Sequence, residues 1–463
     1  MVLKVGLIVD NPLRDLEGLV LLAYQLAKKG HDCWLVPMYD QTFDVRAIGL
    51  DYLVLNYLRP NNVDHAKLYM LEGVKVAVLD TEGMAGRSAE EFAGFVNKTG
   101  FASKLNAYFV WGESQFRAVL DEGAVPKETL FLTGCPRYDF CAEPWRKSLP
   151  PRKVDLPYVL VNTNFALTNP RFSAGTGTEL QNMLKVGFSE ESALRFVQDA
   201  KLAQNGMIEL VQYLVEELPE LQFVLRPHPF ENTSPYEVIS HRGNFQIRQE
   251  STSVEWVNHA LALLHLNCST ALEARMLGVP AITPAWLDTD EIRIPGPHAV
   301  SMHCQTREEL LEVMSDLSRQ DYSRDLNVQG GDELLRQLYF RIDGKASERV
   351  CEAILDTAAR PANRMDWGRP SIRTVWLTRF RGLMGYRLFS WLLGVFNPQK
   401  RPENRAAKYF SVNQVGEIVQ RLYKVDPLPK QVNVSAMNEA ELPSRKMASG
   451  RSICIHASLG DGA

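Results

Sequence analysis

The sequence predicts an α/β protein with mainly parallel sheets in more than one domain. Short apolar runs alternate with helical patterns along most of the chain, which is typical of βαβ units. The chain has 463 residues, enough for two or three domains with substantial cores. The segment 142–157 combines four prolines with four arginines and lysines and separates two such series. We therefore place a domain boundary there.

Composition excludes several classes of protein. The chain is 45% hydrophobic and 23% charged, which is ordinary for a globular protein, and its net charge of -4 gives no nucleic-acid footprint. Seven cysteines without paired short spacing argue against both a disulfide framework and a zinc site. No Asp-x-Asp pair stands at a convincing strand end, so we expect neither a metal nor a cofactor.

We predict the cellular location from two features that the sequence does not show, a signal peptide and a membrane span. The first residues show no small-residue cleavage pattern of a signal peptide. No run approaches the roughly 18 apolar residues of a membrane span. We expect a cytoplasmic protein with reduced thiols, with contact to the inner surface of a membrane as an alternative.

The first predicted domain covers residues 1–145. Its helices are expected at 19–27, with Gly30 as C-cap, and around 65–71. Its strands are expected at 5–9, 33–36, 52–55, 74–79, 108–110 and 130–133.

Acidic residues recur where these strands end. Asp10 follows the first strand, Glu82 lies in Asp80-Thr81-Glu82-Gly83, and Glu113 follows Trp111-Gly112. One interpretation is a general base for an acceptor hydroxyl, with its pKa tuned by burial. The other is that such residues only cap the next helix.

Arg137 stands in a turn of the form Gly-x-Pro-Arg-x-Asp. The turn could present the guanidinium to a phosphate or a carboxylate. Alternatively it is a tight turn closed by an Arg137–Asp139 pair.

The second predicted domain covers residues 155–360. A strand at 158–161 ends in Asn162-Thr163-Asn164, whose amides and hydroxyl suit phosphate or sugar. A strand at 223–225 ends in Arg226-Pro227-His228-Pro229, and one at 260–266 leads to a helix at 271–278 and a strand at 279–283. The long helix at 190–217 has a core-facing stripe and is interpreted as structural.

These strand ends predict an anion site, because ligands bind at the carboxyl ends of open α/β sheets. Arg226 offers a planar fork for phosphate or carboxylate, and His228 can donate to a phosphate or leaving group, with Pro229 fixing the turn. Ser269 and Thr270 start a helix, where an anion is favoured. Four residues on from Ser269, the carboxylate of Glu273 could accept from ribose hydroxyls.

Two less specific interpretations stay open in this domain. Ser269 and Thr270 could simply cap the helix, with Glu273 completing a capping box. His265, inside its strand, could be a hydrogen-bonded core histidine or could line the crevice.

The ordered series of motifs resembles the bacterial surface carbohydrate biosynthesis protein family, over about residues 3–425. These are GT-B-like proteins, similar to the polysaccharide Kdo and sialic acid transferases that share a His-Pro element. The motifs that carry the resemblance are the first strand, Asp15-Leu16-Glu17-Gly18 (as a turn) with its Leu-rich helix, Asp80-Thr81-Glu82-Gly83, Thr133-Gly134-Cys135-Pro136-Arg137-Tyr138-Asp139, Val161-Asn162-Thr163-Asn164-Phe165, Arg226-Pro227-His228-Pro229-Phe230-Glu231 and Ser269-Thr270-Ala271-Leu272-Glu273-Ala274.

The resemblance implies two facing Rossmann-like domains with the nucleotide on the second. It implies that His228, Ser269, Thr270 and Glu273 hold phosphate and ribose, and that acids such as Glu82 face the acceptor. Cys135 stands where Asn is expected, so no side-chain role carries over to that position.

The carboxyl-terminal region has a different character. We expect a basic amphipathic helical extension over 365–425, since arginines and lysines recur at 369–401 among aromatic and apolar residues without an acid. It could lie on an anionic membrane surface or pack over the protein. Its last helices could cross back to the first domain, and 426–463 is predicted to be a disordered tail.

Together these features predict a glycosyltransferase. It would move a sugar from a nucleotide-sugar donor, CMP- or UDP-linked, to a cell-surface polysaccharide or its lipid-linked precursor. The alternatives are a UDP-sugar 2-epimerase-like enzyme and a non-catalytic scaffold of the same machinery.

Overall fold

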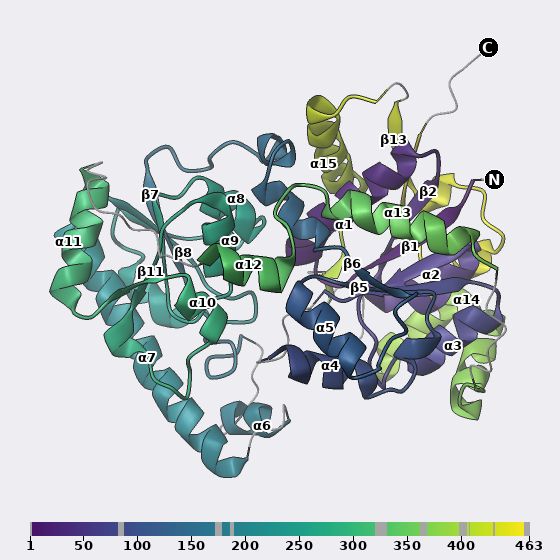
Figure 1. Ribbon diagram of the computed structural model, residues 1–463, viewed down its shortest axis with the longest axis horizontal. Coiled ribbons are helices and arrows are strands. Elements are labelled where there is room, and N and C mark those ends of the chain that lie inside the picture. Colours follow the sequence, from purple (N-terminus) through teal and green to yellow (C-terminus); the bar gives the residue numbers. More distant parts are fainter. Residues whose placement is uncertain are drawn as a thin grey trace. The chain divides into compact units, whose positions relative to one another are not determined.

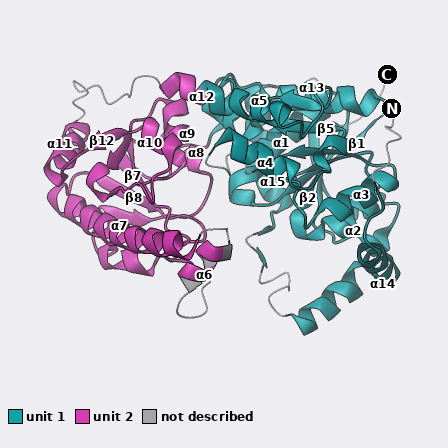
Figure 2. Cartoon of the chain, turned by 60° about the horizontal axis from the view of Figure 1, so that its bottom comes forward, with its two compact units in different colours: residues 1–149, 336–463 teal, residues 150–335 magenta. Residues whose placement is uncertain are grey.

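The chain folds into two compact α/β units, and the first of them includes the carboxyl-terminal region with its helices and two strands. The computed structural model describes residues 2–81, 88–171, 178–185, 189–319, 331–361, 368–397, 405–406, 408–428 and 431–457. Unit 1 comprises Met1–Leu149 with Arg336–Ala463, and unit 2 comprises Pro150–Leu335 (Figure 2). Each unit is Rossmann-like, with helices packed on a largely or wholly parallel sheet (Figure 1). The predicted fold class is confirmed.

Unit 1 is built on an eight-stranded sheet of order β13-β14-β2-β1-β3-β4-β5-β6. The first six strands of the chain pair in parallel, and β14 and β13 add to the β2 edge in antiparallel fashion. The six parallel strands are β1 (Lys4–Val9), β2 (Asp32–Pro37), β3 (Tyr52–Leu55), β4 (Lys75–Leu79), β5 (Ala107–Val110) and β6 (Leu130–Leu132). Most are buried on both faces, as expected for parallel strands covered by helices.

The helices of unit 1 come from both ends of the chain. They are α1 (Pro12–Lys28), α2 (Gln41–Ile48), α3 (Val63–Leu71), α4 (Ala89–Asn97), α5 (Glu113–Asp121), α13 (Ala346–Ala359), α14 (Ile372–Phe396) and α15 (Val412–Val425). Helix α12 (Gly331–Tyr339) contains the passage of the chain from unit 2 back to unit 1.

Helix α1 starts earlier than predicted. The side chain of Asn11 accepts from the amide N–H of Leu13 at 3.2 Å, and Pro12 occupies the first helical position, where its missing N–H is not needed. The predicted turn at residues 15–18 is therefore wrong, because these residues are helical. The local signal for the true helix start was the cap residue Asn11 followed by Pro12, which lies seven residues before the apolar pattern begins at Leu19.

The predicted disorder of the tail 426–463 is also wrong for its described residues 431–457. Strand β14 (Ile453–Ala457) pairs with β2, and β13 (Val432–Ala436) pairs with β14. Ile453 and Ile455 are buried in the unit 1 core. These strands are short and separated by a loop, so they are stabilised by pairing with a distant strand and have no strong local periodicity.

Residues 336–360, predicted to close the second domain, belong to unit 1. Helix α13 packs against α1. Its first amide groups, of Ala346 and Ser347, each donate to the carboxylate of Asp139 at 2.8 Å. A carboxylate from far away in the sequence thus stabilises the start of this helix.

Unit 2 has a six-stranded, fully parallel sheet of order β12-β11-β10-β7-β8-β9. Its strands are β7 (Tyr158–Asn162), β8 (Gln222–Arg226), β9 (Phe245–Ile247), β10 (Ala262–His265), β11 (Ala281–Pro284) and β12 (Met302–Cys304). Its helices are α6 (Thr178–Lys185), α7 (Glu190–Glu217), α8 (Ser253–Asn258), α9 (Thr270–Leu277), α10 (Pro295–Ala299) and α11 (Arg307–Ser318). The inner face of α7 is buried in the core at Ala200, Met207, Leu210 and Leu214, as the stripe predicted. Leu194 and Leu202 were predicted to belong to the same stripe but are 44% and 70% exposed.

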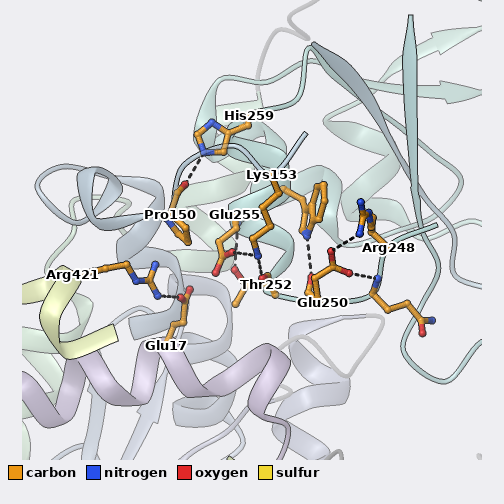
Figure 3. A network of polar contacts seen from close by, with 12 residues as sticks. Glu17, Pro150, Lys153, Arg248, Glu250, Thr252, Glu255, His259 and Arg421 are labelled. Atoms are coloured by element: carbon orange, nitrogen blue, oxygen red, sulfur yellow. Dashed lines mark hydrogen bonds and ion pairs between the residues drawn. The ribbon is translucent and has the colours of Figure 1, made fainter. Parts of the chain in front are cut away.

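The predicted boundary segment joins unit 2 through polar contacts (Figure 3). His259 Nε2 lies 2.9 Å from the carbonyl oxygen of Pro150, and Lys153 Nζ lies 3.1 Å from Glu255 Oε2. Within unit 1, Figure 3 also shows Arg421 of α15 reaching Glu17 of α1 at 2.5 Å. The carboxyl-terminal helix α15 is thereby held to the first helix of the chain.

Candidate functional site in unit 2

Three polar side chains form a row at the carboxyl ends of adjacent strands in unit 2. Asn162 of β7 is the register partner of Arg226 on β8 and of His265 on β10. Register partners on neighbouring strands project to the same face of a sheet. The row therefore places an amide, a guanidinium and an imidazole beside one another where open α/β sheets bind ligands.

The guanidinium of Arg226 is fixed by the loop that follows β9. Its Nη2 donates to the carbonyls of Ser251 at 2.8 Å and of Glu250 at 3.3 Å. Burial lowers the pKa of Arg226, while the negative charges of Glu273 and Glu250 act in the opposite direction. The strand end thus carries a largely buried cation that is partly compensated by nearby carboxylates.

Two buried polar atoms in this row have no hydrogen-bond partner among the described residues: Asn162 Oδ1 and Arg226 Nε. The amide of Asn162 also lies against Cys268. Burial raises the pKa of the Cys268 thiol, and its hydrogen bonds with Thr270 and Asn162 oppose that rise. Buried polar groups are normally paired, because leaving one unpaired costs about 1–3 kcal/mol. An acceptor and a donor left open side by side are the arrangement expected of a site that a polar ligand completes.

His228 lies just beyond the end of β8. Its Nδ1 accepts from the amide N–H of Phe230 at 3.2 Å, so the neutral imidazole carries its proton on Nε2. Pro229 follows it as an exposed residue of the same turn. This tautomer suits donation to an oxygen anion.

Glu231 stabilises the turn at His228 and Pro229. Sequence reasoning did not identify it as a site residue. It is fully buried and accepts from Tyr236 at 2.6 Å, from Thr163 at 2.9 Å and from the amide N–H of Phe165 at 3.1 Å. Burial raises the pKa of this carboxyl group. Glu231 therefore ties the end of β7 to the end of β8, and its position directly after the His-Pro turn was the available signal.

The start of α9 differs from an ordinary capped helix. Ser269 occupies the N-cap position, is exposed, and makes no side-chain cap hydrogen bond. Thr270 and Glu273 are buried, and Thr270 Oγ1 lies 3.3 Å from Cys268 Sγ. The predicted capping box at Ser269 is not formed, so the interpretation of Ser269 as a structural cap is wrong.

The loop before α9 is held by Asn267. Its backbone is left-handed, with φ at 54°, a conformation that asparagine tolerates better than most residues. Its side chain donates to Asp288 at 2.8 Å and accepts from the amide N–H of Ile294 at 3.1 Å, and its carbonyl accepts from the exposed Asn164 at 3.3 Å. Asn164 thus bridges the β7 end to the α9 loop.

His265 is a satisfied core histidine. It is 1% exposed; its Nδ1 accepts from the amide N–H of Cys268 at 3.4 Å, and its Nε2 lies 2.7 Å from Ser301 Oγ. Because Ser301 donates its own proton to the carbonyl of Pro297, the imidazole donates to Ser301. Burial lowers the pKa of His265 to about 3, so it stays neutral and structural.

The predicted acids of the first domain are placed less favourably. Asp10 lies 3.2 Å from Arg14 Nη2 and 3.1 Å from Lys408 Nζ, so both of its oxygens contact cations. That arrangement fits an ion-pair role better than a general base. Glu82 lies outside the described residues.

Arg137 lies at the strand ends of unit 1, stacked on Trp111 and Tyr138 at 5.3 and 4.7 Å from the ring centroids. Its Nη1 is 3.8 Å from Asp15 Oδ1. A small pocket of about 20 Å³, room for about one water, adjoins it. The alternative of an Arg137–Asp139 pair is wrong, since Asp139 caps α13 instead.

Within the described ranges, no group of three or more His, Cys, Asp or Glu side chains is placed to hold a metal ion. Among the helices in the described part of the chain, none has both the length and the apolar character needed to cross a membrane.

Comparison with known proteins gives fold-level similarity to sugar-nucleotide enzymes. No protein-family model and no curated protein sequence matches the chain. Among solved structures, UDP-GlcNAc 2-epimerase from Methanocaldococcus jannaschii is 13% identical, with a TM-score of 0.47 over 76% of this chain and 99% of that one. S. aureus MnaA bound to UDP is 14% identical, with a TM-score of 0.46 over 76% and 95%. The wall teichoic acid polymerase TagF is 11% identical, with a TM-score of 0.44 over 77% and 89%. Similarity at this level carries no information about the function of this chain.

Proposed function

We propose that the protein is a glycosyltransferase that binds a nucleotide-sugar donor, CMP- or UDP-linked. The donor site lies in unit 2, at the carboxyl ends of β7 and β8 and the amino-terminal start of α9. The observation that carries the proposal is the pair of open buried atoms, Asn162 Oδ1 and Arg226 Nε, at adjacent strand ends. A nucleotide offers hydrogen-bond partners for both atoms. Its hydroxyl or amino groups can donate to the amide oxygen, and its phosphate oxygens can accept from the guanidinium.

The surrounding groups have consistent roles in this proposal. His228 donates from Nε2 to a phosphate oxygen, and the exposed Ser269 at the positive end of α9 offers a hydroxyl to the same anion. The Glu273 carboxylate accepts from ribose hydroxyls. As the donor sugar leaves, charge grows on the phosphate, and these fixed donors stabilise it.

The transfer step and the acceptor rest on the motif series of the chain. We propose a surface polysaccharide or its lipid-linked precursor as acceptor, with Glu82 as the candidate base and no metal or cofactor required. Arg137 is proposed to orient an anionic group of the acceptor in unit 1.

The first test is thermal unfolding of the full chain with CMP, UDP, GDP and CDP in turn. We expect one nucleotide to raise the melting temperature increasingly with its concentration. His228→Gln should raise the dissociation constant for that nucleotide at least about tenfold, since a hydrogen bond to a charged group contributes about 1.5–3 kcal/mol. His241→Gln, an exposed histidine elsewhere in unit 2, is the matched control and should bind as wild type. No shift with any nucleotide would refute the proposal.

The second test separates transfer from epimerisation and from scaffolding. A labelled donor of the nucleotide found above is incubated with and without cell-envelope glycan. We expect label in the glycan and an unchanged donor when no acceptor is present. Conversion of a UDP-sugar to its 2-epimer without acceptor would instead establish the epimerase. Normal polysaccharide production in cells carrying His228→Gln would favour the scaffold.

A further inference from the structure

Helix α14 presents an apolar stripe to solvent. Ile372, Trp376 and Leu383 recur at i, i+4 and i+11 on one face of its first half and are 78%, 70% and 75% exposed. The stripe continues in the second half with Leu388, Trp391 and Val395, all at least half exposed. Large apolar side chains gathered this densely on a surface mark an interaction site.

Positive charge accompanies the stripe without any acid. Residues 368–397 contain no Asp or Glu. By helical geometry, Arg373 and Arg379 lie at the two edges of the stripe in the first half, and Arg387 lies at its edge in the second. All three side chains are exposed. The face therefore combines apolar anchors with flanking cations.

The orientation of α14 is fixed by its other face. The Tyr386 hydroxyl lies 3.4 Å from Asp40, and the ring of Phe43 packs against Tyr386 and Phe389 with centroids at 5.3 and 5.5 Å. Arg381 stacks on Phe389 at 5.1 Å. These contacts hold one face of α14 against unit 1, and the exposed residues of the stripe lie on another face of the helix. Figure 2 shows α14 at the edge of unit 1.

A charged groove adjoins the stripe where the helix kinks. Gly385 has φ at 74°, and a Cβ there would meet the Lys446 backbone oxygen at 2.8 Å, so only glycine fits the kink. Beside it lies a groove of about 700 Å³ whose cations are Arg387, Arg445 and Lys446 and whose apolar lining includes Leu388. Among the described residues that line this groove, none is acidic.

We propose that α14 and this groove bind the surface of a membrane that contains anionic phospholipids. The stripe would enter the headgroup–acyl boundary, and the arginines and groove cations would hold headgroup phosphates. A nucleic acid would leave the exposed aliphatic residues Ile372, Leu383 and Val395 without a role. This inference goes beyond the proposed function and does not depend on it.

The experiment is co-sedimentation of the full chain with phosphatidylcholine vesicles, with and without phosphatidylglycerol. We expect binding to the anionic vesicles that weakens with salt, and little binding to the neutral ones. Arg373→Gln and Arg379→Gln should each lower the partition coefficient about fivefold. Trp376→Ser with Trp391→Ser should lower it at least about tenfold, since these are the interfacial anchors.

Matched controls are Arg117→Gln on α5 and Leu202→Ser on α7, whose side chains are also mostly exposed. Both should bind vesicles as wild type. All variants replace exposed side chains, so their melting temperatures should equal that of the wild type. Equal binding to both kinds of vesicle, no binding to either, or a dimer in light scattering that the tryptophan substitutions dissociate would each overturn the proposal.

Discussion

Asn162 and Arg226 are register partners on the parallel strands β7 and β8, and each carries one buried polar atom that no described residue pairs. The two carbonyls that accept from Arg226 Nη2 hold the guanidinium at the strand end. The open Nε and the open amide oxygen are thereby kept together. Because this donor and this acceptor are already held in place, less conformational entropy is lost when a ligand that pairs with both of them binds.

Replacing Asn162 should separate stability from binding. Asn162→Ala removes a side chain whose oxygen has no described partner, so we expect a loss of about 1 kcal/mol or less in unfolding free energy but loss of nucleotide binding. Asn244→Ala is the matched control: its buried amide nitrogen lies 3.0–3.2 Å from the carbonyls of Val215, Leu218 and Leu221. The control should lose about 2–3 kcal/mol and still bind. Urea unfolding and nucleotide titration measure both; equal losses of stability would contradict an open amide at Asn162.

Ser269 is expected to be neutral for stability. Because it makes no cap hydrogen bond, Ser269→Ala should change the unfolding free energy by less than about 0.5 kcal/mol while weakening nucleotide binding. The comparison is Thr306→Ala, since Thr306 caps α11 by accepting from the amide N–H of Glu309 at 3.1 Å. That variant should lose about 1 kcal/mol and bind normally. A Ser269 variant as unstable as the Thr306 variant would restore the capping interpretation.

Gly18 allows α1 to approach the Arg137 turn. A Cβ at this position would lie 2.7 Å from the Arg137 backbone nitrogen, so Gly18→Ala should cost about 1–3 kcal/mol by forcing the two segments apart. Gly94 is also inside a helix, but a Cβ there would meet nothing within 4 Å, so Gly94→Ala should gain about 0.5–1 kcal/mol. The midpoints of denaturant unfolding of the two variants measure these changes in stability. Tolerance of alanine at Gly18 would show that this approach is not close in solution.

The buried His265 predicts a pH dependence of stability. Its folded pKa is about 3, below the ordinary value of 6.5. As pH falls below about 6.5, the unfolded chain binds a proton here that the folded chain does not, so the unfolding free energy should fall toward pH 3. His265→Gln should reduce the slope by up to about 1.4 kcal/mol per pH unit. Urea unfolding at a series of pH values measures this slope, and identical slopes for the two proteins would show that folding does not lower the pKa of His265.

Sequence reasoning located the parts of the site that depend on local pattern. The ends of β7 and β8 were predicted because an apolar run followed by polar residues is a local signal, and α7 was predicted because its stripe recurs at helical spacing. The pairing of Asn162 with His265 was not visible, because β10 comes to lie beside β7 through a long crossover.

The role of single residues depended on distant partners. Ser269 and Thr270 followed by Glu273 have the pattern of a capping box, but packing buries Glu273 near Arg226 and leaves Ser269 without a cap bond. Asp139 has the spacing of a partner for Arg137, yet it caps α13 more than two hundred residues later.

By itself the sequence determined the α/β class, most strand positions, a few of the helices, and which polar residues stand at strand ends, because these follow from hydrophobic period and from caps within a few residues. Only the tertiary structure decided the strand order, the assignment of 336–360 to unit 1, the sheet strands β13 and β14, and the outward stripe of α14. Each of these depends on pairing or packing between segments far apart in the chain, which local spacing does not encode.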